Sequence, residues 1–128
     1  MSKPAKTRNL GTWTEAKYWG SIRSHLRRMF RHNWEPAKHA LLSMRRPAQR
    51  PDRPLLKWEF KCQACGHWHP RKDVELDHLF PCGSLLTTQD FGGFIGRLLP
   101  ETSDAYQVLC KSCHLVKTVA EKAARKAA

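Results

Sequence analysis

The chain has 128 residues, with 23 lysines and arginines against 11 aspartates and glutamates, so its formal net charge is +12 at pH 7. This length suits one domain, or a small domain with an extension, and the charge indicates a polyanionic partner. No apolar run approaches the roughly 20 residues of a membrane span, and no signal-peptide core is visible. We therefore expect a cytoplasmic protein that has no membrane partner.

The positive charge lies almost entirely in the first half of the chain. Residues 1–58 hold 14 basic and 3 acidic side chains, whereas residues 59–128 hold 9 basic and 8 acidic ones. The first half is therefore predicted to bind the partner. The second half holds all five cysteines, and in the cytoplasm paired cysteines more often bind metal than form disulfides.

The first half is predicted to form a basic helical hairpin. Residues 1–11 carry almost no apolar side chains and are expected to form a flexible tail. Thr12 and Glu15 have the spacing of a capping box, so a helix should begin there. Apolar residues then recur at helical intervals, and they are Trp19, Ile22, Leu26, Met29 and Phe30.

Three arginines, Arg23, Arg27 and Arg31, line another face of this helix at intervals of four residues. A solvated charged face is the plainer interpretation of such a pattern. The large charge excess of this half favours phosphate contacts instead, so the three arginines are predicted to bind nucleic acid.

A second helix is predicted from about Glu35, because Pro36 stands where proline favours the first helical turn. The hairpin of the two helices should dock on the second half of the chain through Trp13, Trp19 or Trp34. The side of the second helix that is predicted to be buried consists of Ala37, Ala40, Leu41 and Met44.

Prolines then interrupt the pattern at positions 47, 51 and 54, with arginines between them. An extended linker of this composition is the predicted domain boundary. It divides the chain into a basic extension, residues 1–54, and a C-terminal domain, residues 55–128. The linker either lies along a nucleic-acid backbone or is simply solvated.

The second half alternates short strands and helices, which indicates an α+β domain. Strands are predicted at residues 57–61, 74–77 and 106–109. A helix that three glycines weaken is predicted at 91–99, and a last helix from about Ser112. This last helix is predicted to bury Leu115, Val116 and Val119.

Two Cys-x-x-Cys pairs lie in this half, with 44 residues between them. Four thiolates in this arrangement suit a closed, tetrahedral, structural zinc ion, on which small domains often depend for folding. The predicted ligands are Cys62, Cys65, Cys110 and Cys113. The alternative ligand set is Cys62, Cys65, His67 and His69. This alternative leaves the second cysteine pair unexplained. Cys82 is assigned to packing, and Trp68 to a place over the metal.

The strand that begins at Val74 ends in an adjacent carboxylate and imidazole, Asp77 and His78. Aspartate offers a hard oxygen ligand for a metal ion, and histidine offers a base whose pKa is ordinarily about 6.5. His114 directly follows the second cysteine pair, so zinc would bring the three side chains together around one divalent ion. A surface or helix-capping histidine is the plainer interpretation of His114.

The cysteine pairs, together with Val-Glu-Leu-Asp-His-Leu-Phe-Pro and Gln-Val-Leu-Cys-Lys-Ser-Cys-His, resemble the HNH endonucleases, in particular the small zinc-containing HNH nucleases of phage genomes. The resemblance covers residues 57–119 and implies a zinc-stabilised ββα-metal fold. It implies that Asp77 and His114 bind a catalytic divalent ion, Mg²⁺, Mn²⁺ or another, and that His78 is the general base. Lys117 lies near enough in sequence to neutralise a DNA phosphate, or else is an ordinary surface lysine.

One position departs from the family pattern. The family usually has an asparagine two residues before Gln107, where it braces the loop that carries the base. This chain has Ala105 there, with Asp104 beside it. Either Asp104 substitutes for the missing asparagine, or the brace is absent.

The resemblance implies a metal-dependent endonuclease that nicks or cuts double-stranded DNA, in the host cytoplasm if a phage encodes it. One alternative is a zinc-stabilised DNA-binding module without catalysis, which Ala105 motivates. Another is an accessory subunit of a phage DNA-processing complex, with packaging or replication proteins as partners. The joint presence of Asp77, His78 and His114 favours the enzyme.

Overall fold

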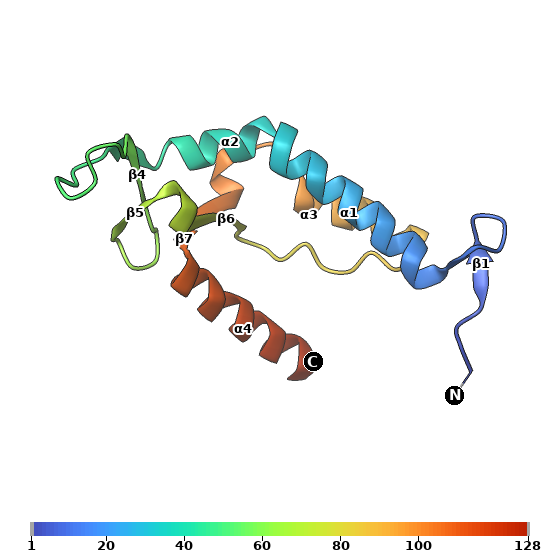
Figure 1. Ribbon diagram of the computed structural model, residues 1–128. Coiled ribbons are helices and arrows are strands. Elements are labelled where there is room, and N and C mark those ends of the chain that lie inside the picture. The colour runs from blue at the N-terminus through green and yellow to red at the C-terminus, as the bar shows by residue number, and fades with distance from the viewer. Residues whose placement is uncertain (1, 128) are drawn as a thin grey trace. The chain divides into compact units, whose positions relative to one another are not determined.

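A computed structural model describes residues 2–127, and in this part of the chain it shows a mixed α+β fold with four α-helices and small antiparallel sheets (Figure 1). The chain divides into two compact units. We call residues up to Glu35, together with Phe80–Glu101, the helical unit. Residues 36–79, together with those from Thr102 onward, form the cysteine unit.

In the helical unit, the first residues form a small ribbon rather than the predicted tail. Strand β1 (Lys6–Arg8) pairs with β2 (Trp13–Thr14). The turn between them places Asn9, Leu10 and Gly11 at positive φ. The predicted tail therefore forms ordered structure over part of its length.

Helix α1 (Glu15–Asn33) begins within three residues of the predicted start. The cap is Thr14, whose hydroxyl accepts a hydrogen bond from the Lys17 amide at 3.1 Å. Thr12 instead donates its hydroxyl to the Asn9 carbonyl at 2.6 Å. The capping-box spacing thus located the helix, but the side chain that caps it lies two residues further along.

The core of the helical unit lies between α1 and α3 (Phe91–Leu98). Met29 is 40% exposed, so the predicted apolar stripe is correct except at this residue. Trp34 adds a hydrogen bond from its indole nitrogen to the Pro100 carbonyl, at 2.9 Å. The first helix of the predicted hairpin therefore packs on the 80–101 segment through Trp19 and Trp34, within one unit. The buried core residues are Trp19, Cys82, Leu85, Phe94 and Leu98, with Ile22, Leu26 and Phe30 packed against them.

One glycine of α3, Gly93, has a packing function. A Cβ on Gly93 would lie 2.9 Å from Nη1 of Arg97. The Arg97 guanidinium lies over this position and donates from Nε to the Cys82 carbonyl at 2.7 Å. Glycine at position 93 therefore gives the arginine room to fasten the preceding loop, at a cost in helix propensity of about 1 kcal/mol.

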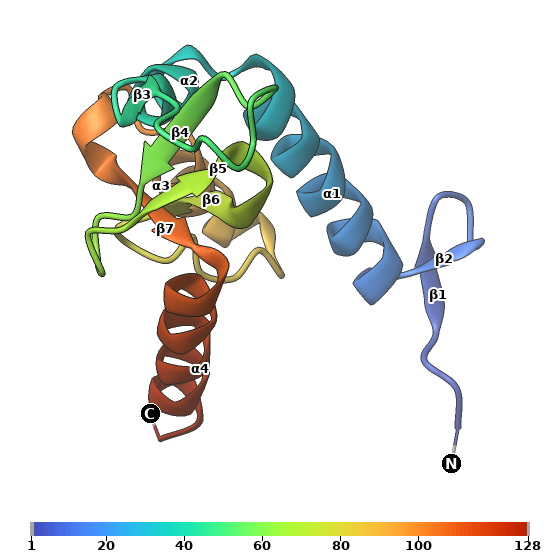
Figure 2. The same ribbon diagram turned by 60° about the vertical axis from the view of Figure 1, so that its left-hand side comes forward.

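The cysteine unit contains two antiparallel sheets, which Figure 2 shows. The first sheet has the order β3 (Arg45–Pro47), β4 (Trp58–Lys61), β5 (Trp68–Pro70). The second pairs β6 (Val74–His78) with β7 (Tyr106–Cys110). The strands predicted at 57–61, 74–77 and 106–109 are thus confirmed.

Helix α2 (Glu35–Leu42) covers part of this unit's core. Phe60, Val74 and Val108 are buried there, with Leu41 and Met44 packed against them. Ala37 and Ala40 are also buried, so the predicted inward side of α2 is confirmed. Only Trp34 separates α1 from α2, whereas two to five residues usually join an antiparallel helix pair. In addition, α1 and most of α2 belong to different units.

The proline-rich stretch is not an extended linker. Arg45, Arg46 and Pro47 pair with Phe60, Glu59 and Trp58, so residues 45–61 form a β-hairpin with a ten-residue connection, 48–57. Pro47 is tolerated because it lies in a strand at the edge of the sheet. Neither of the two units begins or ends at the domain boundary predicted at residue 54.

Helix α4 (Lys111–Ala127) begins one residue before the predicted start, but its apolar side chains do not point inward. Leu115, Val116 and Val119 are 62%, 70% and 58% exposed, so their predicted burial is wrong. The helix continues from the end of β7 and extends beyond the two-stranded sheet (Figure 2), so most of its length has no strand to pack against. In the part of the chain that the structure describes, no helix combines the length and apolar character needed to cross a membrane.

Candidate functional site

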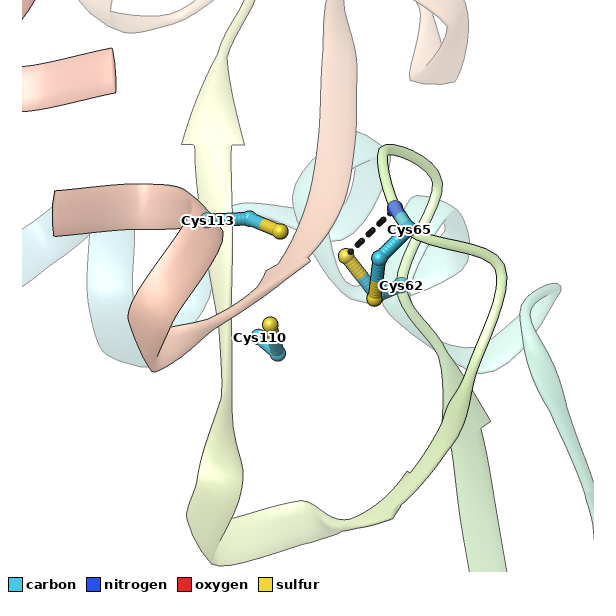
Figure 3. Close-up of side chains that lie close together, drawn as sticks. All are labelled: Cys62, Cys65, Cys110 and Cys113. Carbon is cyan, nitrogen blue, oxygen red and sulfur yellow. Dashed lines mark hydrogen bonds between the residues drawn. The ribbon is translucent and has the colours of Figure 1, made fainter. Parts of the chain in front are cut away.

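The four predicted zinc ligands come together. Cys62 and Cys65 lie on the loop between β4 and β5, Cys110 ends β7, and Cys113 lies in the first turn of α4 (Figure 3). Their sulfur atoms all lie within 4.8 Å of one another, and all four are free thiols. Four sulfurs bound to one tetrahedral zinc ion lie about 3.8 Å apart, because each Zn–S bond is about 2.3 Å long. The cluster could therefore hold a metal ion such as zinc after a small contraction.

The local backbone makes this geometry possible. The Cys62 amide donates to the His67 carbonyl at 2.9 Å, and the Gly66 amide donates to the Cys62 carbonyl at 2.9 Å. Gly66 has φ +79°, a value that glycine adopts without strain. The Cys65 amide also points at the Cys62 sulfur, 3.5 Å away (dashed in Figure 3). The loop thus turns both sulfurs of the first pair toward the second.

The thiols differ in acidity. Burial alone raises the pKa of Cys62, but backbone amides, above all that of Cys65, outweigh it and lower this pKa to about 6. Hydrogen bonds with the Cys110 and Cys62 thiols raise the pKa of Cys113 to about 12. The Cys62 thiolate is therefore favoured at neutral pH while Cys113 keeps its proton, which a metal ion would displace on binding.

The alternative ligand set is not assembled. His69 Nε2 lies 4.0 Å from the Cys65 sulfur, and His67 is exposed. Among residues 2–127, the four cysteines are the one group of three or more His, Cys, Asp or Glu side chains whose ligand atoms lie this close together.

Two neighbouring predictions have different outcomes. Cys82 is buried in the core of the helical unit, where its thiol points at the Arg97 carbonyl at 3.8 Å, so its assignment to packing is confirmed. Trp68 is half-buried and lies under the Arg46 guanidinium, 4.0 Å from the ring centre. The ring of Trp68 thus packs against an arginine. The prediction, which placed Trp68 over the metal, did not foresee this contact.

Asp77 and His114 approach each other from β6 and α4. His114 Nε2 lies 3.5 Å from Asp77 Oδ1, and His114 Nδ1 lies 2.7 Å from Glu75 Oε2. Glu75 and Asp77 project from the same face of β6, because side chains two residues apart in a strand share a face. The imidazole thus lies between two carboxylates of one strand.

The other oxygen of Asp77 is occupied. Lys117 Nζ lies 2.7 Å from Asp77 Oδ2, and the Gln107 amide donates to the same oxygen at 3.2 Å. Lys117 also contacts Glu121 at 2.5 Å and donates to the His78 carbonyl at 3.0 Å. Burial alone lowers the pKa of Lys117, but its hydrogen bonds to Asp77 and Glu121 outweigh this and raise the pKa above its usual value. These contacts compete with the predicted contact between Lys117 and a DNA phosphate.

His78 ends β6 opposite Tyr106 and packs edge-on against that ring, with 5.2 Å between the ring centres. The next residue, Leu79, donates its amide to the Ala105 carbonyl at 3.0 Å. The predicted trio is therefore only partly assembled: Asp77 and His114 face each other, and His78 does not join them in a group of three close ligand atoms.

Sequence reasoning overlooked three residues of this site, Glu75, Gln107 and Glu121. Each has a signal in the sequence. Glu75 precedes Asp77 by two residues in a strand, Gln107 opposes Asp77 across the sheet, and Glu121 follows Lys117 by four residues in a helix. These are the spacings at which strand and helix side chains meet.

The three arginines of α1 lie in the helical unit and differ in their contacts. Arg23 donates to the Leu85 carbonyl at 2.7 Å, and the Arg27 guanidinium lies 5.7 Å from the centre of the Phe94 ring. Arg31 is exposed near the end of the helix. Arg23 therefore makes a hydrogen bond within the protein, in addition to the phosphate contact that was predicted for it.

No protein-family model, curated protein or solved structure matches the chain.

Proposed function

We propose that the protein is a metal-dependent HNH endonuclease that hydrolyses DNA phosphodiester bonds and whose fold a zinc ion on the four cysteines stabilises. The observation that carries this proposal is that Asp77 Oδ1 and His114 Nε2 face each other, 3.5 Å apart. Asp77 directly precedes His78 in the chain. Antiparallel strands β6 and β7 followed directly by α4 supply the order of elements that a ββα-metal fold requires.

The residues present fit a catalytic divalent ion. Two ligand atoms that lie about 2.1 Å from one ion are separated by about 3.0 to 3.4 Å, depending on the coordination geometry. The observed separation of 3.5 Å is close to this range. Asp77 supplies a hard oxygen of the kind that Mg²⁺ and Mn²⁺ prefer, and His114 an imidazole nitrogen of the kind that Zn²⁺ and Ni²⁺ prefer. The donor set thus fits a divalent cation whose remaining positions water and phosphate would fill.

In the proposed reaction, His78 accepts a proton from the water that attacks the phosphorus atom. Its role requires the neutral imidazole, and general bases of this kind contribute about 10² to 10⁴-fold in rate. A bound divalent ion would polarise the phosphate and stabilise the leaving oxygen. Lys117 holds Asp77 and the His78 carbonyl in place, because its ammonium contacts both.

We propose the β3–β4 hairpin as a DNA-contacting surface. It belongs to the same unit as Asp77 and His114. Its acids are already engaged: Asp52 pairs with Arg50 at 3.2 Å, and Glu59 is buried at 2% exposure. The Arg45 guanidinium is exposed and stacked on Trp58, 4.0 Å from the ring centre. The basic residues of the hairpin are Arg45, Arg46, Arg50, Arg53, Lys57 and Lys61.

The alternative is a zinc-stabilised DNA-binding module, or an accessory subunit of a DNA-processing complex, that does not cleave. The occupation of one Asp77 oxygen by Lys117 favours this alternative, because a tethered cation already neutralises part of the site. Cleavage of supercoiled plasmid with Mg²⁺, Mn²⁺ or EDTA, measured beside DNA binding in EDTA, separates the two functions. Binding without cleavage in any divalent ion would favour the module.

A further inference from the structure

Each of the two proposed ligands has one atom engaged and one atom left over. His114 has Nδ1 engaged by Glu75 at 2.7 Å, and Asp77 has Oδ2 engaged by Lys117 at 2.7 Å. The atoms left over, His114 Nε2 and Asp77 Oδ1, are the two that face each other. The groups that occupy the other atoms therefore determine which atoms a cation would meet.

The form of His114 that can bind a metal ion is the neutral imidazole. A neutral imidazole has one donor nitrogen and one acceptor nitrogen, whereas an ionised carboxylate only accepts. In this neutral form, the 2.7 Å contact to Glu75 places the proton on Nδ1 and leaves a lone pair on Nε2. A carboxylate behind a metal-binding histidine orients the ring in this way, and its loss typically weakens metal binding 10- to 100-fold.

Placement within the fold supports a specific pair. Glu75 lies on β6 two residues before Asp77, so one strand presents both carboxylates to the same imidazole of α4. The Glu75 side chain is 45% exposed, and an ion pair this exposed contributes little stability, about 0 to 1 kcal/mol. Its contribution to folding is therefore small, while its effect on the imidazole is direct.

We propose that Glu75 is a positioning residue of the divalent-ion site, which holds His114 in the Nδ1–H tautomer so that Nε2 faces Asp77. This inference rests on the proposed assignment of Asp77 and His114 as ligands. Glu75 itself does not touch the ion. Its task is to fix the ring and to make Nε2 a better donor to a divalent cation.

The test compares Glu75→Ala with a matched variant, Glu121→Ala. Glu121 is also an acid that pairs with a cation of this site, but its partner is Lys117 rather than His114. Two properties of the zinc-loaded protein are measured without DNA: the His114 tautomer, from ¹⁵N shifts of the imidazole, and the affinity for Mn²⁺, by calorimetry. A His114→Gln variant identifies the resonances of His114.

We expect the Nδ1–H tautomer in the unaltered protein. Glu75→Ala should increase the Nε2–H population and weaken Mn²⁺ binding at least about tenfold, whereas Glu121→Ala should leave the tautomer unchanged. An Nε2–H tautomer in the unaltered protein would overturn the proposal. So would a Glu75→Ala variant that loses thermal stability but keeps its tautomer and Mn²⁺ affinity.

Two further outcomes of this test have a defined interpretation. If Glu75→Ala does not fold, Glu75→Met keeps the length of the side chain while removing the oxygen acceptors, and the same shift in tautomer or affinity is required of it. If the unaltered protein binds Mn²⁺ but cleaves no DNA, the nuclease function fails while Glu75 remains the positioning residue. The two proposals can therefore fail separately.

Discussion

The backbone amide of Leu79 donates a hydrogen bond to the carbonyl of Ala105, at 3.0 Å. This bond connects the residue that follows His78 to the residue that precedes β7. In the HNH family, which the sequence resembles, asparagine usually stands at the position that corresponds to Ala105 and braces the loop that carries the base. Here the main chain at that same position supplies a connection, which any side chain at residue 105 would leave in place.

The first prediction concerns this brace. Ala105→Asn should change cleavage by less than about threefold, because the carbonyl that accepts the bond is retained. Leu79→Pro removes the donor, and the loss of one such bond, about 1.4 kcal/mol, should slow cleavage about tenfold. Single-turnover cleavage rates measure both variants. A large gain in rate for Ala105→Asn would mean that the main-chain bond does not replace the asparagine.

The second prediction concerns the cysteine cluster. Cys62→Ser should unfold the cysteine unit at 25 °C, because metal–thiolate bonds supply much of the folding free energy of small metal-binding domains. Cys82→Ala is the matched control: it removes a buried thiol in the other unit and should keep a full zinc content. Circular dichroism and elemental analysis measure the two properties. A folded, active protein without zinc would contradict the assignment.

The third prediction separates two arginines of α1. Arg23→Ala should lower the free energy of unfolding by about 1 to 3 kcal/mol, because its guanidinium satisfies the carbonyl of a fully buried residue, Leu85. Arg31→Ala should leave stability within about 0.5 kcal/mol, since it is an exposed surface substitution. Urea unfolding gives both values, and equal losses for the two variants would contradict this distinction.

The fourth prediction concerns the β3–β4 hairpin. Replacement of Arg45, Arg53 and Lys57 by alanine should weaken DNA binding. It should also flatten the salt dependence, by about 0.9 in slope for each phosphate that the variant no longer neutralises. The double variant Arg50→Ala/Asp52→Ala removes an ion pair without changing net charge, and its salt slope should stay unchanged. Binding isotherms at several salt concentrations decide the outcome. A triple variant with an unaltered slope would exclude the hairpin as a phosphate-binding surface.

The sequence was sufficient wherever one local pattern dictated one outcome. The stretches 74–77 and 106–109 were predicted as strands and lie within β6 and β7, and the Cys-x-x-Cys spacing predicted a cluster whose sulfurs lie within 4.8 Å of one another. Asp77 and His114 were also predicted to meet, and they do.

Sequence patterns failed where tertiary context decided the structure. Leu115, Val116 and Val119 have the spacing of a buried helical stripe, but α4 extends beyond the sheet that would cover them. The prolines around residues 47–54 suggested a linker, yet pairing with β4 makes the stretch part of a hairpin. Glu75 was not predicted as a site residue because its contact is with His114, which lies 39 residues away along the chain.

The central claim is that this protein cleaves DNA with His78 as the base. Supercoiled plasmid is incubated with zinc-loaded protein in Mg²⁺, Mn²⁺ or EDTA, beside a His78→Ala variant whose melting temperature and DNA affinity in EDTA are checked. The account predicts nicked or linear DNA that requires a divalent ion, and a loss of at least about 10²-fold in rate for the variant. Cleavage by folded His78→Ala at the unaltered rate, or no cleavage by the unaltered protein in either ion, would contradict it.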